Sequence, residues 1–352
     1  MDRDEGDGIA VVIVNYATSQ LVLAGLPALE AELEPFAHAH VFIVDNASPG
    51  GDGDALASGL EASGPHPRVT LLRSEVNGGF AAGNNVAFAE IRRRGLRPEA
   101  ILLLNPDAEP EPGALAQMLA VMRARPRAGF VGPRLVYPDG TSWAAAFHFP
   151  SMAGEVTKAL GIGVLARMAP ILIPETDVPT RADWITGSAA LVRREAFEAL
   201  GDMDDGYFLY YEEVDYMLQG ARLGWESWHA PAARVRHVGG ASTGVRKSTV
   251  REKRMPAYWF RSWARYFAKN HGPGYARLTA LLTIAARWLG DVQRRLRGQR
   301  DDRPDRFLPD FAANVAFARL SPPPASPSPS PLAAATGAGA SQRLSSASGD
   351  GF

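Results

Sequence analysis

The sequence lacks several features that would each point to a class of protein. It contains no cysteine among its 352 residues, which excludes a disulfide framework and a thiolate metal site and fits a reducing compartment. No stretch reaches the roughly 18 consecutive apolar residues that a membrane-spanning helix needs. Residues 1–8 are acidic and hold no apolar run, so we expect no secretory signal there. These absences predict a protein that is soluble or peripheral to a membrane.

Nucleotide-binding fingerprints are missing as well. The glycine-rich segment 77–85 has neither GxGxxG spacing nor the Gly-Lys-Ser/Thr of a P-loop, which disfavours a dinucleotide-dependent oxidoreductase. The formal net charge of −1 assigns no partner, and without a recognised motif we expect no nucleic acid to bind. With 46% apolar residues, however, the chain can bury a full core.

Continuous apolar runs at 9–14, 41–44 and 101–104, together with a predicted strand at 69–72, alternate with helical patterns. Runs of this kind are typical of strands buried on both faces of a parallel sheet, joined as βαβ units. Each run ends in small polar residues. Because open α/β sheets bind ligands at the carboxyl ends of their strands, these endings predict a polar crevice, although turn chemistry alone explains any single one.

The segment 101–107 is the centre of this pattern. Pro106 has no N–H to donate, so the strand stops there and Asp107 lies just beyond its carboxyl end. A carboxylate at that place can hold a divalent cation that bridges phosphate oxygens; the alternative is that Asp107 only caps a turn. The glycines of segment 77–85 open a helix whose N–H groups could approach a phosphate, but this signal is weak by itself.

A second acidic segment holds Glu212, Glu213 and Asp215 at the start of a predicted helix, amid aromatic residues. Simple placement of negative charge at a helix N-terminus explains the acids. Apolar neighbours, however, raise the pKa of a carboxylate and make it a better general base, and only one of the three need be chemical. Further along, His237 ends a strand before two glycines, where it is either structural or a ligand.

Together these landmarks resemble the inverting GT-A glycosyltransferases of family 2, especially the rhamnosyltransferase-like branch. The match covers about residues 8–245 and rests on the order and spacing of its motifs, which are 12–16 (VIVNY), 44–48 (VDNAS), 77–84, 104–107 (LNPD), Thr186-Gly187, 212–215 (EEVD) and His237. The resemblance implies a GT-A, Rossmann-like mixed sheet flanked by helices. It also implies an enzyme, a glycosyltransferase of the hexosyltransferase type.

The resemblance further implies roles for single residues. Glu213 stands where the catalytic base is usually an aspartate, so Glu212 or Asp215 could share its role, and Asp107 and His237 would hold a divalent cation, Mg²⁺ or Mn²⁺. The residues expected along the nucleotide-sugar are Asn15, Tyr16, Asp45, Asn46, Gly79, Phe80, Asn84, Asn105 and Gly187. Asn105 replaces the first acid of the family's metal motif, so metal coordination is expected to use fewer protein ligands.

The function implied is transfer of a sugar, with dTDP-rhamnose as the expected donor, to a hydroxyl of a glycan or lipid-linked acceptor in bacterial cell-surface polysaccharide synthesis. The alternative is a non-catalytic subunit that binds sugar nucleotides or acts as a scaffold. The expected location is the cytoplasm, at the inner face of the cell membrane.

Three regions are predicted: a catalytic domain at 1–245, a basic amphipathic helical extension at 246–300, and a disordered Pro/Ser/Ala-rich tail at 301–352. The extension holds 14 Lys and Arg against two acids. Trp259, Trp263, Tyr266 and Phe267 share one helical face there, which predicts contact with an anionic membrane. The alternative is that these aromatics pack on the catalytic domain.

Overall fold

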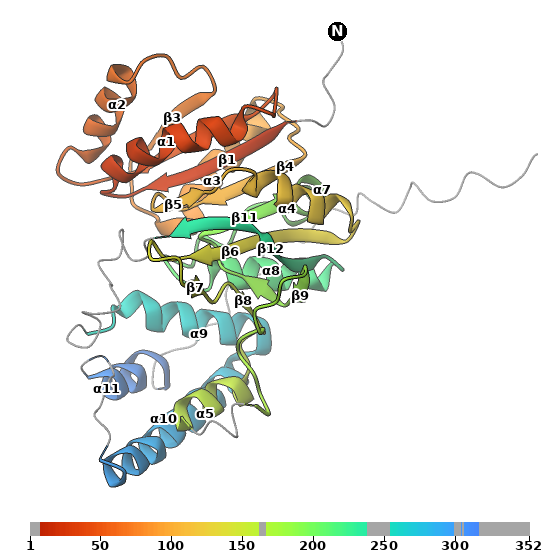
Figure 1. Ribbon diagram of the computed structural model, residues 1–352. Coiled ribbons are helices and arrows are strands. Elements are labelled where there is room, and N and C mark those ends of the chain that lie inside the picture. The colour runs from red at the N-terminus through yellow and green to blue at the C-terminus, as the bar shows by residue number, and fades with distance from the viewer. Residues whose placement is uncertain (1–7, 162–166, 238–253, 299–303, 305, 317–352) are drawn as a thin grey trace, which may run out of the picture.

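The computed structural model describes residues 8–161, 167–237, 254–298, 304 and 306–316, and it centres on one mixed sheet (Figure 1). The main path of this sheet runs in the order β3-β2-β1-β4-β11-β6-β12-β5, with β7 beside β6 and β9 beside β12. Its strands are β1 (Ile9–Asn15), β2 (His40–Asn46), β3 (Val69–Ser74), β4 (Ala100–Leu104), β5 (Ala108–Pro110), β6 (Ala128–Val136), β7 (Ser142–Trp143), β9 (Thr180–Ala182), β11 (Ala189–Arg193) and β12 (Glu226–His237). A separate small sheet pairs β8 (Ala146–Phe147) with β10 (Trp184–Ile185).

The strand directions bring many strand ends to one edge. β1 pairs in parallel with both β2 and β4, and β12 pairs in parallel with β6. β11 is antiparallel to its neighbours β4 and β6, so these two neighbours run the same way. The carboxyl ends of β1, β2, β4, β6 and β12 therefore share an edge, while β11 begins there. The predicted α/β mixed sheet is confirmed.

Helices cover both faces of the sheet because alternate residues of each buried strand point to opposite sides. One core joins α1 (Ser19–Leu33), α2 (Asp52–Ala62) and α4 (Ala114–Arg123) to the face that holds Val11 and Ile13. The other joins α3 (Gly79–Arg93), α7 (Arg194–Leu200) and α8 (Glu212–Arg222) to the face that holds Ala10 and Val12.

The C-terminal helices form a further cluster beyond the sheet (Figure 1). It contains α9 (Ala257–His271), α10 (Pro273–Leu296), α11 (Phe307–Phe311) and the π-helical turn η2 (Ala312–Ala316), with α5 (Met152–Leu160) alongside α10. The disordered tail predicted from residue 301 is wrong for 307–316, because Phe311 and Val315 are buried in this cluster. Residues 317–352 lie outside the described residues.

The aromatic face of α9 is covered by protein, not available to a membrane. Trp263, Tyr266 and Phe267 are fully buried, and they pack with Tyr207 and Val214 of the catalytic region. The prediction that this face contacts lipid is therefore wrong, and the alternative, packing on the catalytic domain, is confirmed. Among the described residues, no helix combines the length and the hydropathy that crossing a bilayer requires.

Candidate active site

The shared edge of the sheet brings together predicted site residues from distant parts of the chain. Asn15 ends β1 and His237 ends β12, while Asn105 directly follows β4. Gly187 precedes β11, which starts at the same edge, and the Asn105 N–H donates to the carbonyl of Ser188 (2.9 Å). Four residues that the sequence predicted separately therefore lie at one edge of the sheet: Asn15, Asn105, Gly187 and His237.

Asn15 is fully buried and its side chain is occupied by the protein itself. Its Nδ2 lies within hydrogen-bond distance of the carboxylates of Asp45 (3.0 Å) and Asp52 (2.9 Å), and its Oδ1 accepts from Thr18 Oγ1 (2.8 Å). Asn15 thus holds two carboxylates in place, whereas the adjacent Tyr16 is only half-buried.

Asp52, at the start of α2, was not predicted from the sequence. Burial would raise its pKa, but hydrogen bonds from Ser19, Asn15 and Ser48 outweigh burial and hold the pKa below its ordinary value. Asp52 is therefore ionised beside Asp45, which is itself 6% exposed. A pair of carboxylates at a strand edge can accept hydrogen bonds from ribose hydroxyls or base N–H groups. The position of Asp52 in the glycine-rich turn after β2 was the only sequence signal for it.

The glycine-rich start of α3 is shaped by a backbone contact. Gly79 has φ of 86°, and a Cβ there would lie 1.7 Å from the carbonyl oxygen of Phe208. Only glycine fits such a conformation and such an approach. The Phe80 N–H donates to the same carbonyl (3.0 Å), and Asn46 Nδ2 donates to Asn77 Oδ1 and to the Gly79 carbonyl (both 3.0 Å). The Phe80 N–H is thus already bonded to protein, not left for a phosphate.

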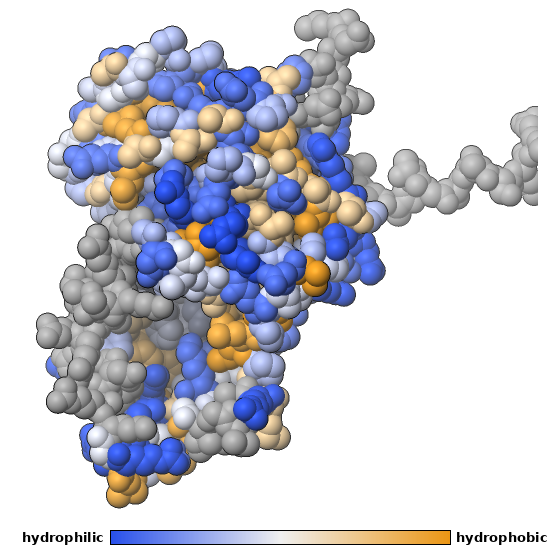
Figure 2. All heavy atoms as spheres, in the orientation of Figure 1, coloured by the Kyte–Doolittle hydropathy of each residue, from blue (hydrophilic) through white to orange (hydrophobic). Residues whose placement is uncertain are grey.

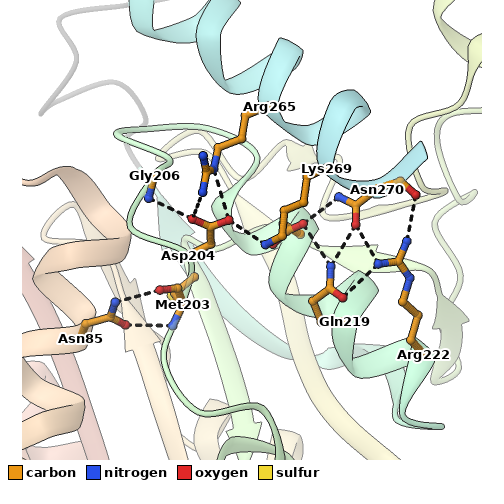
Figure 3. A network of polar contacts seen from close by, with 10 residues as sticks. Asn85, Met203, Asp204, Gly206, Gln219, Arg222, Arg265, Lys269 and Asn270 are labelled. Atoms are coloured by element: carbon orange, nitrogen blue, oxygen red, sulfur yellow. Dashed lines mark hydrogen bonds and ion pairs between the residues drawn. The ribbon is translucent and has the colours of Figure 1, made fainter. Parts of the chain in front are cut away.

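Two asparagines continue α3 in different roles. Asn84 is buried and donates to the Phe80 carbonyl (2.8 Å), while its Oδ1 has no hydrogen-bond partner within the described residues. Asn85 bonds both backbone polar groups of Met203 (2.9 Å each), which fastens α3 to the segment before α8 (Figure 3). Asn84 Oδ1 is therefore a buried hydrogen-bond acceptor in the first turns of α3.

Asp107 and His237 are brought together from positions 130 residues apart. His237 Nε2 lies 3.1 Å from Asp107 Oδ1, and both side chains are about 95% buried, at 5% and 4% exposure. The His237 ring stacks on Trp143 (centroids 4.7 Å apart), which stacks in turn on Tyr137. Trp143, which the sequence analysis did not identify, fixes the ring plane.

This pair fits a divalent cation. Two ligand atoms that lie about 2.1 Å from one ion at right angles are about 3 Å from each other, which is the separation found here. A carboxylate and an imidazole are common ligands of Mn²⁺-type ions. Within the described residues no cluster of three or more His, Cys, Asp or Glu side chains has the arrangement of a metal site. Asp107 and His237 could therefore hold a cation only with further ligands from the substrate.

Glu213 lies against the loop that carries Gly187. A Cβ on Gly187 would be 3.5 Å from Glu213 Cβ and 3.7 Å from the Phe80 ring, so these three predicted residues meet. Burial raises the pKa of Glu213, although hydrogen bonds from its own backbone and from the backbone of Gly187 and Val214 oppose the rise. Its Oε2 is buried and has no partner among the described residues. Glu213 is thus a carboxylate with raised basicity.

Glu212 and the residues before it complete this turn. Burial, followed by the charge of Glu213, raises the pKa of Glu212 well above its ordinary value, so burial favours the protonated form of Glu212 as it does that of Glu213. Tyr210 and Tyr211 both have positive φ (69° and 72°), a conformation that costs on the order of 1–3 kcal/mol per residue outside glycine. A strained backbone therefore presents both glutamates at the start of α8.

Asp215, in the first turn of the same helix, is bound to α9. Its carboxylate accepts from Lys269 Nζ (2.5 Å) and Asn270 Nδ2 (2.7 Å). Lys269 also donates to Asp204 (2.7 Å), which Arg265 binds through two further hydrogen bonds. Two cations of α9, Arg265 and Lys269, thus bind acids of the catalytic region.

The comparisons with known proteins identify the family of the chain. The model of the family "Glycosyl transferase family 2" matches residues 10–201. The chain belongs to this family. An N-acetylglucosaminyl-diphospho-decaprenol L-rhamnosyltransferase of Mycobacterium tuberculosis is 31% identical over 251 residues, which cover 68% of this chain and 78% of the relative. Rhamnosyltransferase WbbL of Escherichia coli is 28% identical over 167 residues, or 45% of this chain and 60% of the relative. The predicted glycosyltransferase activity is confirmed, and the non-catalytic alternative is not retained.

Solved structures of low sequence identity share the fold. A mannosyltransferase of Pyrobaculum calidifontis, in complex with GDP-Man and Mn²⁺, has a TM-score of 0.51 at 16% identity, covering 82% of this chain and 74% of its own. GalNAc-T7 with UDP, GalNAc and Mn²⁺ has a TM-score of 0.52 at 14% identity, covering 90% and 57%. These neighbours confirm the predicted GT-A fold.

Proposed function

We propose that this glycosyltransferase transfers a sugar from a nucleotide-diphosphate donor to a hydroxyl of a lipid-linked glycan, with inversion at the anomeric carbon, in bacterial cell-surface polysaccharide synthesis. The donor we propose is dTDP-rhamnose, because the relatives from Mycobacterium tuberculosis and Escherichia coli are rhamnosyltransferases. The observation that carries the mechanism is Glu213, a carboxylate of raised pKa that lies against Gly187 and Phe80.

Glu213 acts as the general base in this proposal. Its carboxylate accepts the proton of the acceptor hydroxyl while the hydroxyl oxygen attacks the anomeric carbon opposite the diphosphate. The hydrogen bond from Gly187 orients the carboxylate, and the buried Oε2 has no competing partner among the described residues. A base with a raised pKa gains driving force for proton transfer near neutral pH. Glu212, whose pKa burial raises, and Asp215, which is bound to Lys269, position the base and do not themselves accept the proton.

Asp107 and His237 are the residues that would hold a divalent cation, Mg²⁺ or Mn²⁺. Such an ion, when bound, neutralises the charge that develops on the departing diphosphate. In this proposal Asp45, Tyr16 and Asp52 contact the nucleoside. Asn15 holds the carboxylates of Asp45 and Asp52, and Asn46 holds the Gly79 backbone. The proposal assigns the region between the nucleoside and the catalytic base Glu213 to Gly79, Phe80, Asn84 and Asn105.

The acceptor sets the place of action. The Mycobacterium tuberculosis relative is named for a decaprenol-linked substrate, and a polyprenol acceptor of that kind is held in a bilayer while the nucleotide-sugar is dissolved in water. We propose that the enzyme works at the cytoplasmic face of the cell membrane, as a peripheral protein.

A thermal-unfolding panel tests the donor site. The full chain is heated with UDP, dTDP or GDP, each with and without Mn²⁺. A ligand at 100 times its dissociation constant adds about 2.7 kcal/mol of stability, which raises the midpoint by several degrees. We expect dTDP with Mn²⁺ to give the largest shift, and Asp107→Asn to remove the Mn²⁺ dependence.

Transfer is then followed with dTDP-rhamnose and N-acetylglucosaminyl-diphospho-polyprenol, and the anomeric configuration of the product is read by NMR. A product of inverted configuration supports Glu213 as base. A product of retained configuration contradicts the mechanism, and a midpoint that no nucleotide shifts contradicts the proposed donor site.

A further inference from the structure

Helix α10 exposes most of its large apolar residues, whereas most helices of water-soluble proteins bury theirs. Its buried positions are mainly small residues, namely Ala276, Thr279, Ala280, Thr283, Ala286 and Gly290. Most of its large apolar side chains are between 37% and 84% exposed, namely Leu278, Leu281, Leu282, Trp288, Leu289, Val292 and Leu296, whereas Ile284 is partly buried.

The orientation of α10 follows from close backbone packing against α5. A Cβ on Gly290 would lie 2.8 Å from the carbonyl oxygen of Leu160 and 2.9 Å from that of Ala159. Small residues allow helices to approach this closely. A rotation of α10 that buried its leucines would press their side chains into the α5 backbone, so the leucines are left outside.

The exposed apolar residues form a continuous stripe along the helix. At 3.6 residues per turn they fall within an arc of roughly 120°, and the stripe is about 27 Å long at 1.5 Å per residue. We call this set, residues 278, 281, 282, 288, 289, 292 and 296, the outer face of α10. Figure 2 shows hydrophobic atoms beside hydrophilic ones at the lower tip of the molecule, where Figure 1 places one end of α10.

The charged residues that α10 exposes beside the outer face are arginines. Arg277, Arg295 and Arg297 are exposed, and helical geometry places Arg277 and Arg295 along one border of the stripe. Asp291 is the sole acid in the sequence of α10; it is buried and paired with Arg294 (2.5 Å). Among the described residues of α10, the exposed charges beside the apolar stripe are therefore positive.

We propose that the outer face of α10 docks on an anionic lipid bilayer. Its leucines and Trp288 enter the boundary between headgroups and acyl chains, and the bordering arginines meet lipid phosphates, which is how an interfacial amphipathic helix binds. A second copy of the chain fits this face less well, since it would bring identical arginine borders toward each other. The surface differs from the α9 face that the sequence suggested, and it deepens the proposed function by naming the surface that would bring the enzyme to a lipid-linked acceptor.

Co-sedimentation of the full chain with lipid vesicles tests the proposal. The vesicles are phosphatidylcholine alone, or phosphatidylcholine and phosphatidylglycerol in equal parts. We expect binding to the anionic vesicles that weakens with salt. Leu281→Asp with Leu289→Asp should lower the partition coefficient by roughly tenfold or more for each leucine, and Arg277→Gln with Arg295→Gln by roughly fivefold for each arginine.

The matched control is Leu223→Asp, since Leu223 is a 46% exposed leucine outside α10 and its replacement should leave vesicle binding unchanged. Circular dichroism and the unfolding midpoint check that each variant is folded. Wild-type protein that ignores anionic vesicles, or leucine variants that bind them as wild type does, would overturn the proposal.

Analytical ultracentrifugation without lipid tests whether a second copy of the chain occupies the outer face of α10. If the wild type is a dimer, and the leucine variants are monomers that still bind vesicles, a second copy occupies the face and the proposal is wrong. Vesicle binding does not require turnover. Protein that binds vesicles but transfers no sugar would contradict only the proposed function, and active protein that binds no vesicle would contradict only the docking.

Discussion

Buried carboxylates have different partners, and opposite shifts of pKa, in the first turn of α8 and at the junction with α9. In the first turn, Glu212 and Glu213 each keep one buried oxygen without a partner among the described residues, and burial raises both pKa values. At the junction, burial would also raise the pKa of Asp204, but hydrogen bonds from Arg265 and Lys269 hold it below the ordinary value. The two regions are a few residues apart in the chain and share one helix.

This difference separates reactive acids from structural ones. A buried carboxylate without a cationic partner costs stability, and perturbed carboxylates of this kind concentrate at functional sites. A buried carboxylate bound by lysine and arginine instead fastens two elements, here the catalytic region and α9. The acidic run 212–215 looks uniform in the sequence, yet Asp215 is a structural acid bound by Lys269, whereas Glu213 has the surroundings of a reactive acid.

The largest expected effect comes from the two adjacent glutamates. Glu213→Gln removes the proton acceptor and should lower kcat on the order of 10²- to 10⁴-fold, which is the range that general-base catalysis contributes. Glu212→Gln keeps the shape of the side chain and leaves the proposed base in place, so kcat should change little. Steady-state transfer assays measure both, with nucleotide-induced thermal shifts as the check on donor binding. Equal losses in the two variants would contradict the division of roles.

A smaller effect is expected at the junction. Lys269→Met keeps the length of the side chain but leaves Asp204 and Asp215 with one cation fewer in a buried setting, since the Lys269 side chain is 13% exposed and that of Asp215 3%. Removing one partner of a buried ion pair costs about 3–5 kcal/mol. Urea unfolding measures the loss. Arg261→Met, at an exposed position of the same helix, is the control and should change stability by less than about 0.5 kcal/mol. Identical unfolding curves for the two variants would show that the ion pairs do not hold α9.

The catalytic half of the fold was predictable because its signals are local. Buried parallel strands read as short apolar runs that end in polar residues, as in Ile9–Asn15 and His40–Asn46, and the structure places these endings at one edge. Residues such as Asp107 and His237 could be proposed from their positions after strands. Their contact at 3.1 Å depends on the parallel pairing of β12 with β6 and on the antiparallel pairing of β5 with β12, which no local pattern encodes.

The helical cluster was predicted less well because periodicity identifies an apolar face but not what covers it. The aromatic face of α9 has the pattern of an interfacial helix, yet its cover is supplied by Tyr207 and Val214, which are more than 40 residues earlier in the chain. In α10 the informative signal was residue size, with alanine, threonine and glycine on one face and leucine on the other. The helix at 307–316 was missed because a Pro/Ser-rich composition next to it dominated the interpretation of the tail.

The smallest expected effect is on the pH profile, and it tests which glutamate carries the proton. Activity needs ionised Glu213, so kcat/KM should fall as pH decreases through the pKa of Glu213, and burial places that pKa above the ordinary value of about 4.3. If Glu212 is already protonated in this range, it exerts no charge on Glu213, and the acid limb of Glu212→Gln should coincide with that of the wild type. If Glu212 were instead ionised, its removal would relieve repulsion and move the acid limb to lower pH. Coincident limbs therefore assign the shared proton to Glu212, whereas a limb displaced to lower pH would reverse the assignment.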